Sequence, residues 1–262
     1  MHIFKLAWVH FRIGVLNEVQ YRISFFVQLF QSGLGLVTGL FGLALVFSHT
    51  NALGGWSRPE LLVVMGVHIL MGGLIRAMIQ PNMERLMGDV QQGTLDYALT
   101  KPADSQVLIS VREIRIWQTV DIVMGLIVLL VAVVQLKAGI GIWQALAFAA
   151  ALLMGGLMIY SFWLMITTGA FWVVRIDNVL SLFEGLYQAG RWPIGIYPDW
   201  LKTSLTFLVP IAFAVTLPAE ALTGRLTEPT TLLGAAALTA LLLAVSRWVW
   251  RRGLKQYSGA SA

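Results

Sequence analysis

The side chains best placed to do chemistry in this sequence are ionisable groups that stand within long apolar runs. Asp121, Glu184 and Arg191 are of this kind. An ionisable residue at membrane depth is energetically costly and commonly marks a transport pathway. Glu184 and Arg191 are seven residues apart, about two turns of a helix, so a helix would place them on one face. Two interpretations stay open: these residues line a pathway, or they anchor helices at the membrane interface.

Several other kinds of chemistry have no residues to support them. The sequence has no Gly-x-x-x-x-Gly-Lys-Ser/Thr phosphate loop and no cysteine, which excludes that mode of ATP binding and any thiolate site. The histidines are scattered without metal-ligand spacing, at positions His2, His10, His49 and His68. Nothing places a substrate beside the carboxylates of the polar interval. We therefore expect neither a catalytic nor a metal site.

The composition indicates an integral membrane protein. Of the 262 residues, 58% are hydrophobic and only 12% are charged, whereas a soluble domain carries about 25% charged residues. The formal net charge of +5 fits an excess of Lys and Arg on the cytoplasmic side of a membrane. We therefore expect a lipid bilayer around the chain and no nucleic-acid partner.

The apolar runs predict an all-α membrane protein that forms one transmembrane domain over residues 1–262. Runs long enough to cross a hydrocarbon core of about 30 Å give six transmembrane helices, at residues 23–47, 61–79, 116–136, 143–174, 179–196 and 230–250. Residues 1–22 alternate charged and apolar positions at helical spacing, which predicts an N-terminal interfacial helix. Residues 197–229 are broken by Pro210 and Pro218 and predict short re-entrant helices on the outer side.

The charge distribution sets the expected orientation. An even number of spans places both termini on one side of the membrane. If that side is cytoplasmic, thirteen of the 18 Lys and Arg residues lie in cytoplasmic segments, as the positive-inside rule requires. We therefore expect both termini in the cytoplasm.

Residues 80–115 form the longest polar interval between spans and predict a cytoplasmic coupling elbow. Pro81 favours the first turn of a short helix, and Gly93 and Thr94 favour a turn and the cap of a second one. Lys101 precedes Pro102 and so disfavours further helix. The charged residues expected to project into the cytoplasm are Glu84, Arg85, Asp89 and Asp96. This pattern favours a docking surface for another protein over a merely solvated loop.

Two stretches resemble a known family. Residues 93–102 (GTLDYALTKP) resemble its Gly-x-Leu-Asp…Leu…Lys/Arg-Pro pattern after the second span. The segments IYPDWL (196–201), FLVPIAF (207–213) and LPA (217–219) are similar to its segment before the last span. With the six-span layout, the chain resembles the permease subunits of the type-2 ABC exporter superfamily, in the small bacterial branch without a fused ATPase.

The resemblance implies a bacterial cytoplasmic membrane protein that pairs with ABC ATPase subunits and with a second permease, identical or homologous. ATP and Mg²⁺ would bind to the ATPases, so this chain would hold no cofactor and would not be an enzyme. The interfacial helix with Arg12 and the elbow would contact the ATPases. The path would run between two permeases, along the first, second and fifth spans, for a drug, lipid or glycan. The candidate path residues are Asp121, Glu184 and Arg191.

Three alternatives remain at this point. An ion-coupled secondary transporter or channel would work without an ATPase and would depend on Asp121, Glu184 or Glu220. A membrane enzyme such as a lipid transferase would need a catalytic constellation, which the sequence does not show. A non-transporting assembly subunit would lose only a partner when the elbow is altered.

Overall fold

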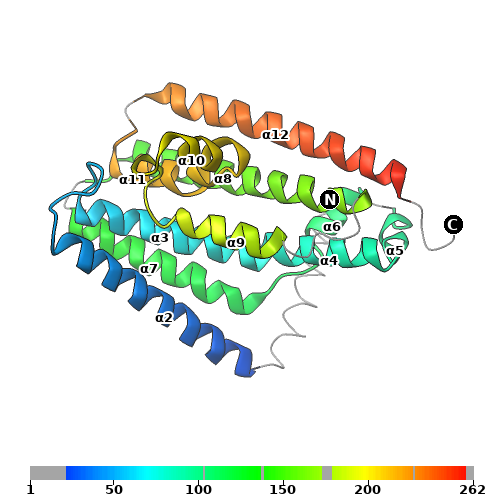
Figure 1. Ribbon diagram of the computed structural model, residues 1–262, viewed down its shortest axis with the longest axis horizontal. Coiled ribbons are helices and arrows are strands. Elements are labelled where there is room, and N and C mark those ends of the chain that lie inside the picture. The colour runs from blue at the N-terminus through cyan, green and yellow to red at the C-terminus, as the bar shows by residue number, and fades with distance from the viewer. Residues whose placement is uncertain (1–21, 103, 137–138, 173–178, 227, 258–262) are drawn as a thin grey trace.

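The computed structural model describes residues 22–102, 104–136, 139–172, 179–226 and 228–257 (Figure 1). Within these ranges all regular elements are helices, and the one strand-like pairing is an isolated bridge between Leu53 and Trp56. The predicted all-α class is confirmed. The predicted interfacial helix at residues 1–22, including Arg12, lies outside the described residues except for its last position.

Among the described residues, five long helices run along the bundle (Figure 1), and each is long and apolar enough to cross a membrane. They are α2 (Arg22–Phe47); α3 (Arg58–Leu74) continued by the π-helical turn η1 (Ile75–Ile79) and α4 (Gln80–Gln91); η2 (Ile116–Gln118) with α7 (Thr119–Leu136); α8 (Ile142–Thr168) with η3 (Gly169–Phe171); and α12 (Pro229–Gln256). The predicted first, third, fourth and last spans correspond to four of these helices.

The predicted fifth span at residues 179–196 is only partly helical. In the described part of this segment, which begins at residue 179, the helix α9 (Val179–Ala189) covers 11 residues, or about 16 Å, and a hydrocarbon core is about 30 Å thick. The helix ends because the chain turns at Gly190 and Arg191 ahead of Pro193. Arg191 thus follows the helix, and the prediction that it shares a helical face with Glu184 is wrong.

The segment before α12 folds as a bent pair of short helical arms. The first arm is α10 (Asp199–Thr203) with η5 (Ser204–Leu208), and the second is η6 (Ala212–Thr216) with α11 (Leu217–Thr223). The arms meet at an angle of 79°. We call this pair the hairpin.

Contacts at three points show that the hairpin enters the bundle and returns to the same end. Before the first arm, the side chain of Ile196 lies against Gly54. After the second arm, Arg225 bonds to Glu60 in the first turn of α3. The bend lies deeper, because Ile211 packs against Gly190 next to the His68 ring. The hairpin therefore has short helical arms in the region where short re-entrant helices are predicted, and their placement relative to a membrane stays a prediction. The end of the bundle that holds residues 48–57 is called the loop end below, and the opposite end the elbow end.

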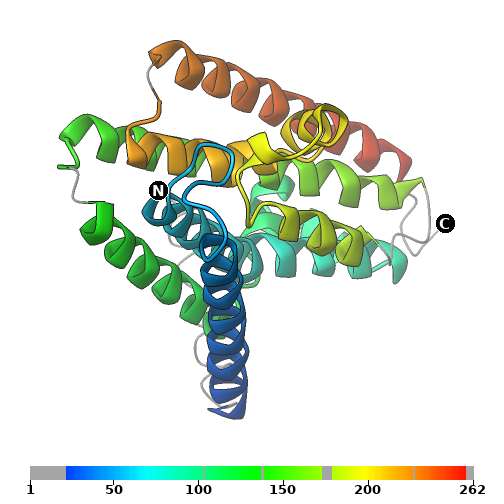
Figure 2. The same ribbon diagram turned by 60° about the vertical axis from the view of Figure 1, so that its left-hand side comes forward.

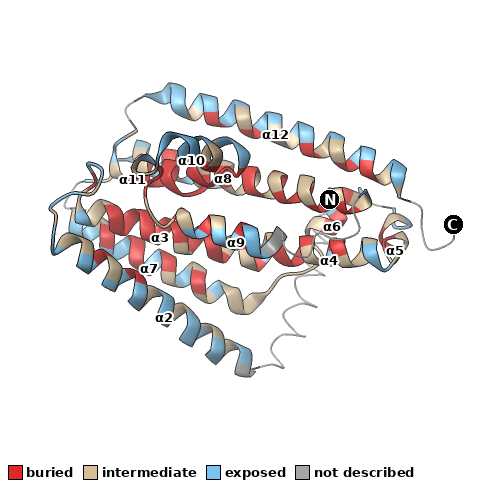
Figure 3. Cartoon of the chain, viewed as in Figure 1, coloured by how far each residue is buried: buried red, intermediate tan, exposed pale blue. Residues whose placement is uncertain are grey.

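The centre of the bundle is the contact between α3 and α7, and α3 is buried along most of its length (Figure 3). Gly125 on α7 faces the backbone of Leu70, and Gly66 on α3 faces Leu129. A Cβ added at Gly125 would lie 2.5 Å from the Leu70 nitrogen, so only glycine permits this approach of the two helices. Small residues serve this purpose between membrane helices.

In contrast, α2 is mostly exposed (Figure 3) and diverges from the other helices toward its N-terminal end (Figure 2). Its Gly33, Gly35 and Gly42 have nothing within 4 Å of an added Cβ. The weak attachment of α2 opens one side of α3 to the cavity described below.

Candidate functional site

The elbow begins as a direct continuation of the second span. Residues Arg58–Gln91 form one helical run of 34 residues, so the predicted boundary between a span ending at residue 79 and a separate elbow helix is wrong. Pro81 has no N–H to offer the carbonyl of Ala77, four residues earlier. That carbonyl instead accepts the backbone N–H of Arg115 at 3.0 Å. The π-helical turn just before Pro81 accommodates the irregularity without ending the helix. We call this run the coupling rod.

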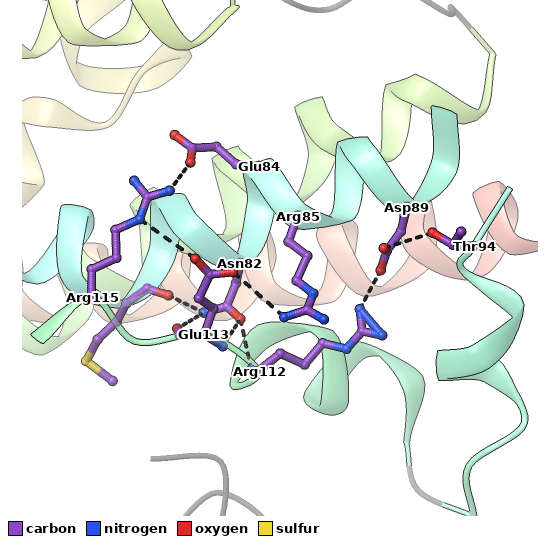
Figure 4. Close-up of polar contacts among 9 residues, drawn as sticks. Asn82, Glu84, Arg85, Asp89, Thr94, Arg112, Glu113 and Arg115 are labelled. Atoms are coloured by element: carbon purple, nitrogen blue, oxygen red, sulfur yellow. Dashed lines mark hydrogen bonds and ion pairs between the residues drawn. The ribbon is translucent and has the colours of Figure 1, made fainter. Parts of the chain in front are cut away.

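Asn82 attaches the end of the elbow to the coupling rod (Figure 4). Its Oδ1 accepts the backbone N–H groups of Arg112 and Glu113, each at 2.9 Å. Its Nδ2 donates to the carbonyls of Glu113 and Met78, each at 2.7 Å. The residue is 2% exposed. Sequence reasoning missed Asn82, because its partners Arg112 and Glu113 lie about 30 positions further along the chain.

The predicted coupling residues Glu84 and Asp89 reinforce the same junction (Figure 4). Glu84 pairs with Arg115 at 2.5 Å, and Asp89 pairs with Arg112 at 2.5 Å. Asp89 also accepts the hydroxyl of Thr94 at 3.0 Å. These two carboxylates therefore bind within the elbow, which corrects the expectation that they project freely. Burial lowers the pKa of Arg112, and the Asp89 carboxylate opposes that effect.

The other two predicted coupling residues lie nearer the surface of the elbow. The side chain of Arg85 is 51% exposed, and its distance to Glu113 is 3.8 Å. Asp96 is partly exposed at the start of α5 (Asp96–Leu99), next to Tyr97, which is 77% exposed. Arg85, Asp96 and Tyr97 are therefore accessible to a partner of the elbow.

The elbow is also attached to the last long helix. Asp104 caps α6 (Ser105–Ser110) by accepting the N–H groups of Gln106 and Val107. Arg247 of α12 donates to both carboxylate oxygens of Asp104 and, at 2.8 Å, to Oε1 of Gln106. The Arg247 guanidinium holds the pKa of the Asp104 carboxyl below its usual value. The elbow is thus tied both to the coupling rod and to α12.

A second polar region lies in the middle of the bundle, around Asp121 of α7. Asp121 is 4% exposed and pairs with Arg76 of the coupling rod at 2.6 Å. It also accepts the amide of Gln28 at 3.2 Å and the hydroxyl of Ser32, both from α2. Gln118 bonds to Arg76 and to Gln28 at 3.3 and 3.1 Å. These side chains join three membrane-spanning helices through one hydrogen-bonded network.

A cavity of about 280 Å³ lies against this network and is lined by α2, α3, α7 and the end of α9. Asp121 and Arg191 both line it. Glu184 lines a second cavity of about 210 Å³, which shares Arg76 and Gln188 with the first. The three predicted path residues therefore lie around two neighbouring cavities along the coupling rod. We call the first of these the polar cavity.

The described part of the chain contains no group of three or more His, Asp or Glu side chains arranged to hold a metal ion. The arrangement is suited to binding and to mechanical coupling.

Comparison with known proteins agrees with the architecture. A family model described as ABC-2 family transporter protein matches residues 34–261, nearly the whole chain. Searches of curated proteins and of solved structures found no significant match. The match covers the coupling rod, the elbow, the hairpin and all of the polar cavity except Gln28, Gln31 and Ser32. The chain therefore belongs to the ABC-2 transporter family, as a multi-pass membrane permease subunit of an ABC transporter.

Proposed function

We propose that this chain forms half of the translocation path of an ATP-driven exporter in the bacterial cytoplasmic membrane. Separate ATPase subunits dock against the elbow and bind ATP and Mg²⁺. A second permease, identical or homologous, completes the path. Both termini and the elbow face the cytoplasm. The exported compound is an amphipathic or hydrophobic molecule such as a drug, lipid or glycan.

The observation that carries this proposal is the coupling rod. One helical run of 34 residues bears the elbow junction at Asn82 and Glu84 and, one to two turns earlier, Arg76 of the polar cavity. A displacement of the elbow is therefore transmitted along one helix to the wall of the cavity, without an intervening flexible loop.

The proposed mechanism uses this connection to carry movement from the elbow to the cavity. ATP shifts the conformational equilibrium only by binding one state of the assembly better than the other. Closure of the ATPases displaces the elbow together with α3 and α7, which the glycine contacts hold together. The cavity wall then moves relative to the weakly attached α2, and the cavity changes from inward-open to outward-open.

The absence of cysteine from the sequence makes a cross-linking test clean. Tyr97→Cys places a single thiol on the exposed surface of the elbow, and Asn51→Cys places one on an exposed residue at the loop end. The complex is purified from native membranes in mild detergent and treated with a short reagent that joins a maleimide to a photoactivatable group, so that the cross-link needs no cysteine on the partner. We expect Tyr97→Cys to cross-link to an ATPase subunit and Asn51→Cys not to.

The same preparation should hydrolyse ATP in a vanadate-sensitive manner. Well-folded protein with no ATPase attached and no cross-link at residue 97 would refute the proposal. It would favour an ion-coupled transporter in which Glu184 carries the ion, since Glu184 is exposed whereas Asp121 is already paired with Arg76.

A further inference from the structure

We propose that the polar cavity binds the negatively charged headgroup of an amphipathic substrate, with Arg191 as its charged contact. This inference rests on the proposed function and names the substrate class of the same path.

The first support for the inference is the balance of charge in the cavity lining. Arg76 is neutralised by Asp121 at 2.6 Å, whereas Arg191 has no carboxylate within ion-pair distance among the described residues. Its guanidinium bonds to the neutral Oε1 of Gln188 at 3.1 Å.

The cavity lining thus carries one positive charge in excess. A cation at membrane depth without a counter-ion is energetically costly, and an anionic ligand removes that cost. Arginine suits this role, because its planar guanidinium offers several donors in a geometry that matches phosphate and carboxylate oxygens.

The second support is His68, which lines the same cavity. The residue is 6% exposed, and its Nδ1 is fully buried with no hydrogen-bond partner in the described part of the chain. The ring is held by stacking on Tyr187, with ring centroids 4.5 Å apart, and the Tyr187 hydroxyl donates to the His68 carbonyl at 2.8 Å. Because Nδ1 has no exposed surface and lies beside Gly190 at the hairpin bend, His68 supplies a rigid aromatic wall of the cavity rather than a hydrogen bond to the ligand.

The third support is the mixed character and the size of the cavity. Gln31 and Gln188 offer amide donors, while Leu36, Ile69 and Met124 line the same space with apolar surface. A volume of about 280 Å³ is just below the range of whole drug-sized ligand pockets, about 300–1,000 Å³. The cavity therefore suits a headgroup and the start of an acyl chain rather than an entire lipid.

The test compares two probes that differ in headgroup charge. The full-length protein is placed in phosphatidylcholine nanodiscs and titrated with lysophosphatidylglycerol or with lysophosphatidylcholine of the same acyl chain, and bound probe is counted by native mass spectrometry. Hydrogen bonds to a charged group contribute about 1.5–3 kcal/mol, so we expect about tenfold or greater preference for the anionic probe.

Variants decide whether Arg191 is responsible. Arg191→Gln should abolish the preference and Arg191→Lys should retain most of it, with correct folding checked by size-exclusion chromatography. Lys202→Gln is the matched control, because it removes an exposed positive charge that does not line the cavity and should leave the preference unchanged. A preference that survives in Arg191→Gln would overturn the inference.

Two further results separate the possible failures. If wild-type protein shows no preference and Glu184→Gln creates one, a carboxylate of a second copy neutralises Arg191, and the inference is wrong. If the preference is absent although Tyr97→Cys cross-links to the ATPase, the substrate class is wrong while the proposed function stands. A missing cross-link removes the proposed function whatever the probes show.

Discussion

Asn82→Ala is the most informative change to the elbow junction. The substitution removes four hydrogen bonds of 2.7–2.9 Å and leaves two backbone N–H groups and two carbonyls without their partner at a position that is 2% exposed. A buried group that loses its partner costs about 1–3 kcal/mol, and water entering the space left by the side chain recovers part of this. We therefore expect local destabilisation of about 2 kcal/mol for residues 111–116.

Hydrogen exchange measures this local effect directly. A cost of about 2 kcal/mol corresponds to roughly 30-fold faster exchange of the amides of Arg112 and Glu113, read from a peptide that covers residues 108–118. Gln92→Ala is the control, because Gln92 is an exposed amide side chain just past the end of α4. Unchanged exchange at residues 112–113 in Asn82→Ala would refute the assignment of Asn82 as the attachment point.

Three more predictions concern contacts that hold the bundle together. Because the pKa of Asp104 is lowered in the folded protein, its ion pair with Arg247 stabilises α6 above the ordinary carboxyl pKa of about 4 and is lost as the pH falls through the lowered value. The protection factors of the α6 amides, which correct for the pH dependence of intrinsic exchange, should therefore fall on acidification in wild type and be low at every pH in Arg247→Gln. Gly125→Ala should cost about 1–3 kcal/mol by forcing α3 and α7 apart, seen as a lower melting temperature in detergent, whereas Gly33→Ala, which meets nothing within 4 Å, should not lower it. Asp121→Asn should cost up to about 3 kcal/mol, because it leaves a partly buried guanidinium without its counter-ion, and an unchanged melting temperature would contradict the role given to that pair.

The long spans could be predicted from the sequence because their signal is local. A charge-free run of sufficient length predicts a membrane helix by itself, and α2 and the run of η2 with α7 begin and end within one residue of the predicted bounds. The family resemblance carried by residues 93–102 and 196–219 is confirmed by the family match.

The predictions failed where tertiary contacts overrode a local rule. Pro81 indicated a new helix, but the carbonyl that it frees is satisfied by Arg115, more than 30 residues later, so the helix continues. The apolar residues after α9 indicated more helix, but the chain turns at Gly190, which packs against Ile211 at the hairpin bend. The pairing of Asp121 with Arg76 was equally invisible, because nothing in a linear sequence brings those two positions together.

The central claim is that the coupling rod transmits nucleotide-driven movement from the elbow to the polar cavity. Gly35→Cys places a single thiol in the cavity at a position with no neighbour within 4 Å. In the purified complex with its ATPase, the rate of labelling by a membrane-impermeant maleimide should change several-fold between the nucleotide-free and vanadate-trapped states. The change should disappear in the Asn82→Ala background while ATP hydrolysis continues. Equal labelling rates of Gly35→Cys in the nucleotide-free and vanadate-trapped complexes, with Asn82 intact, would contradict the claim.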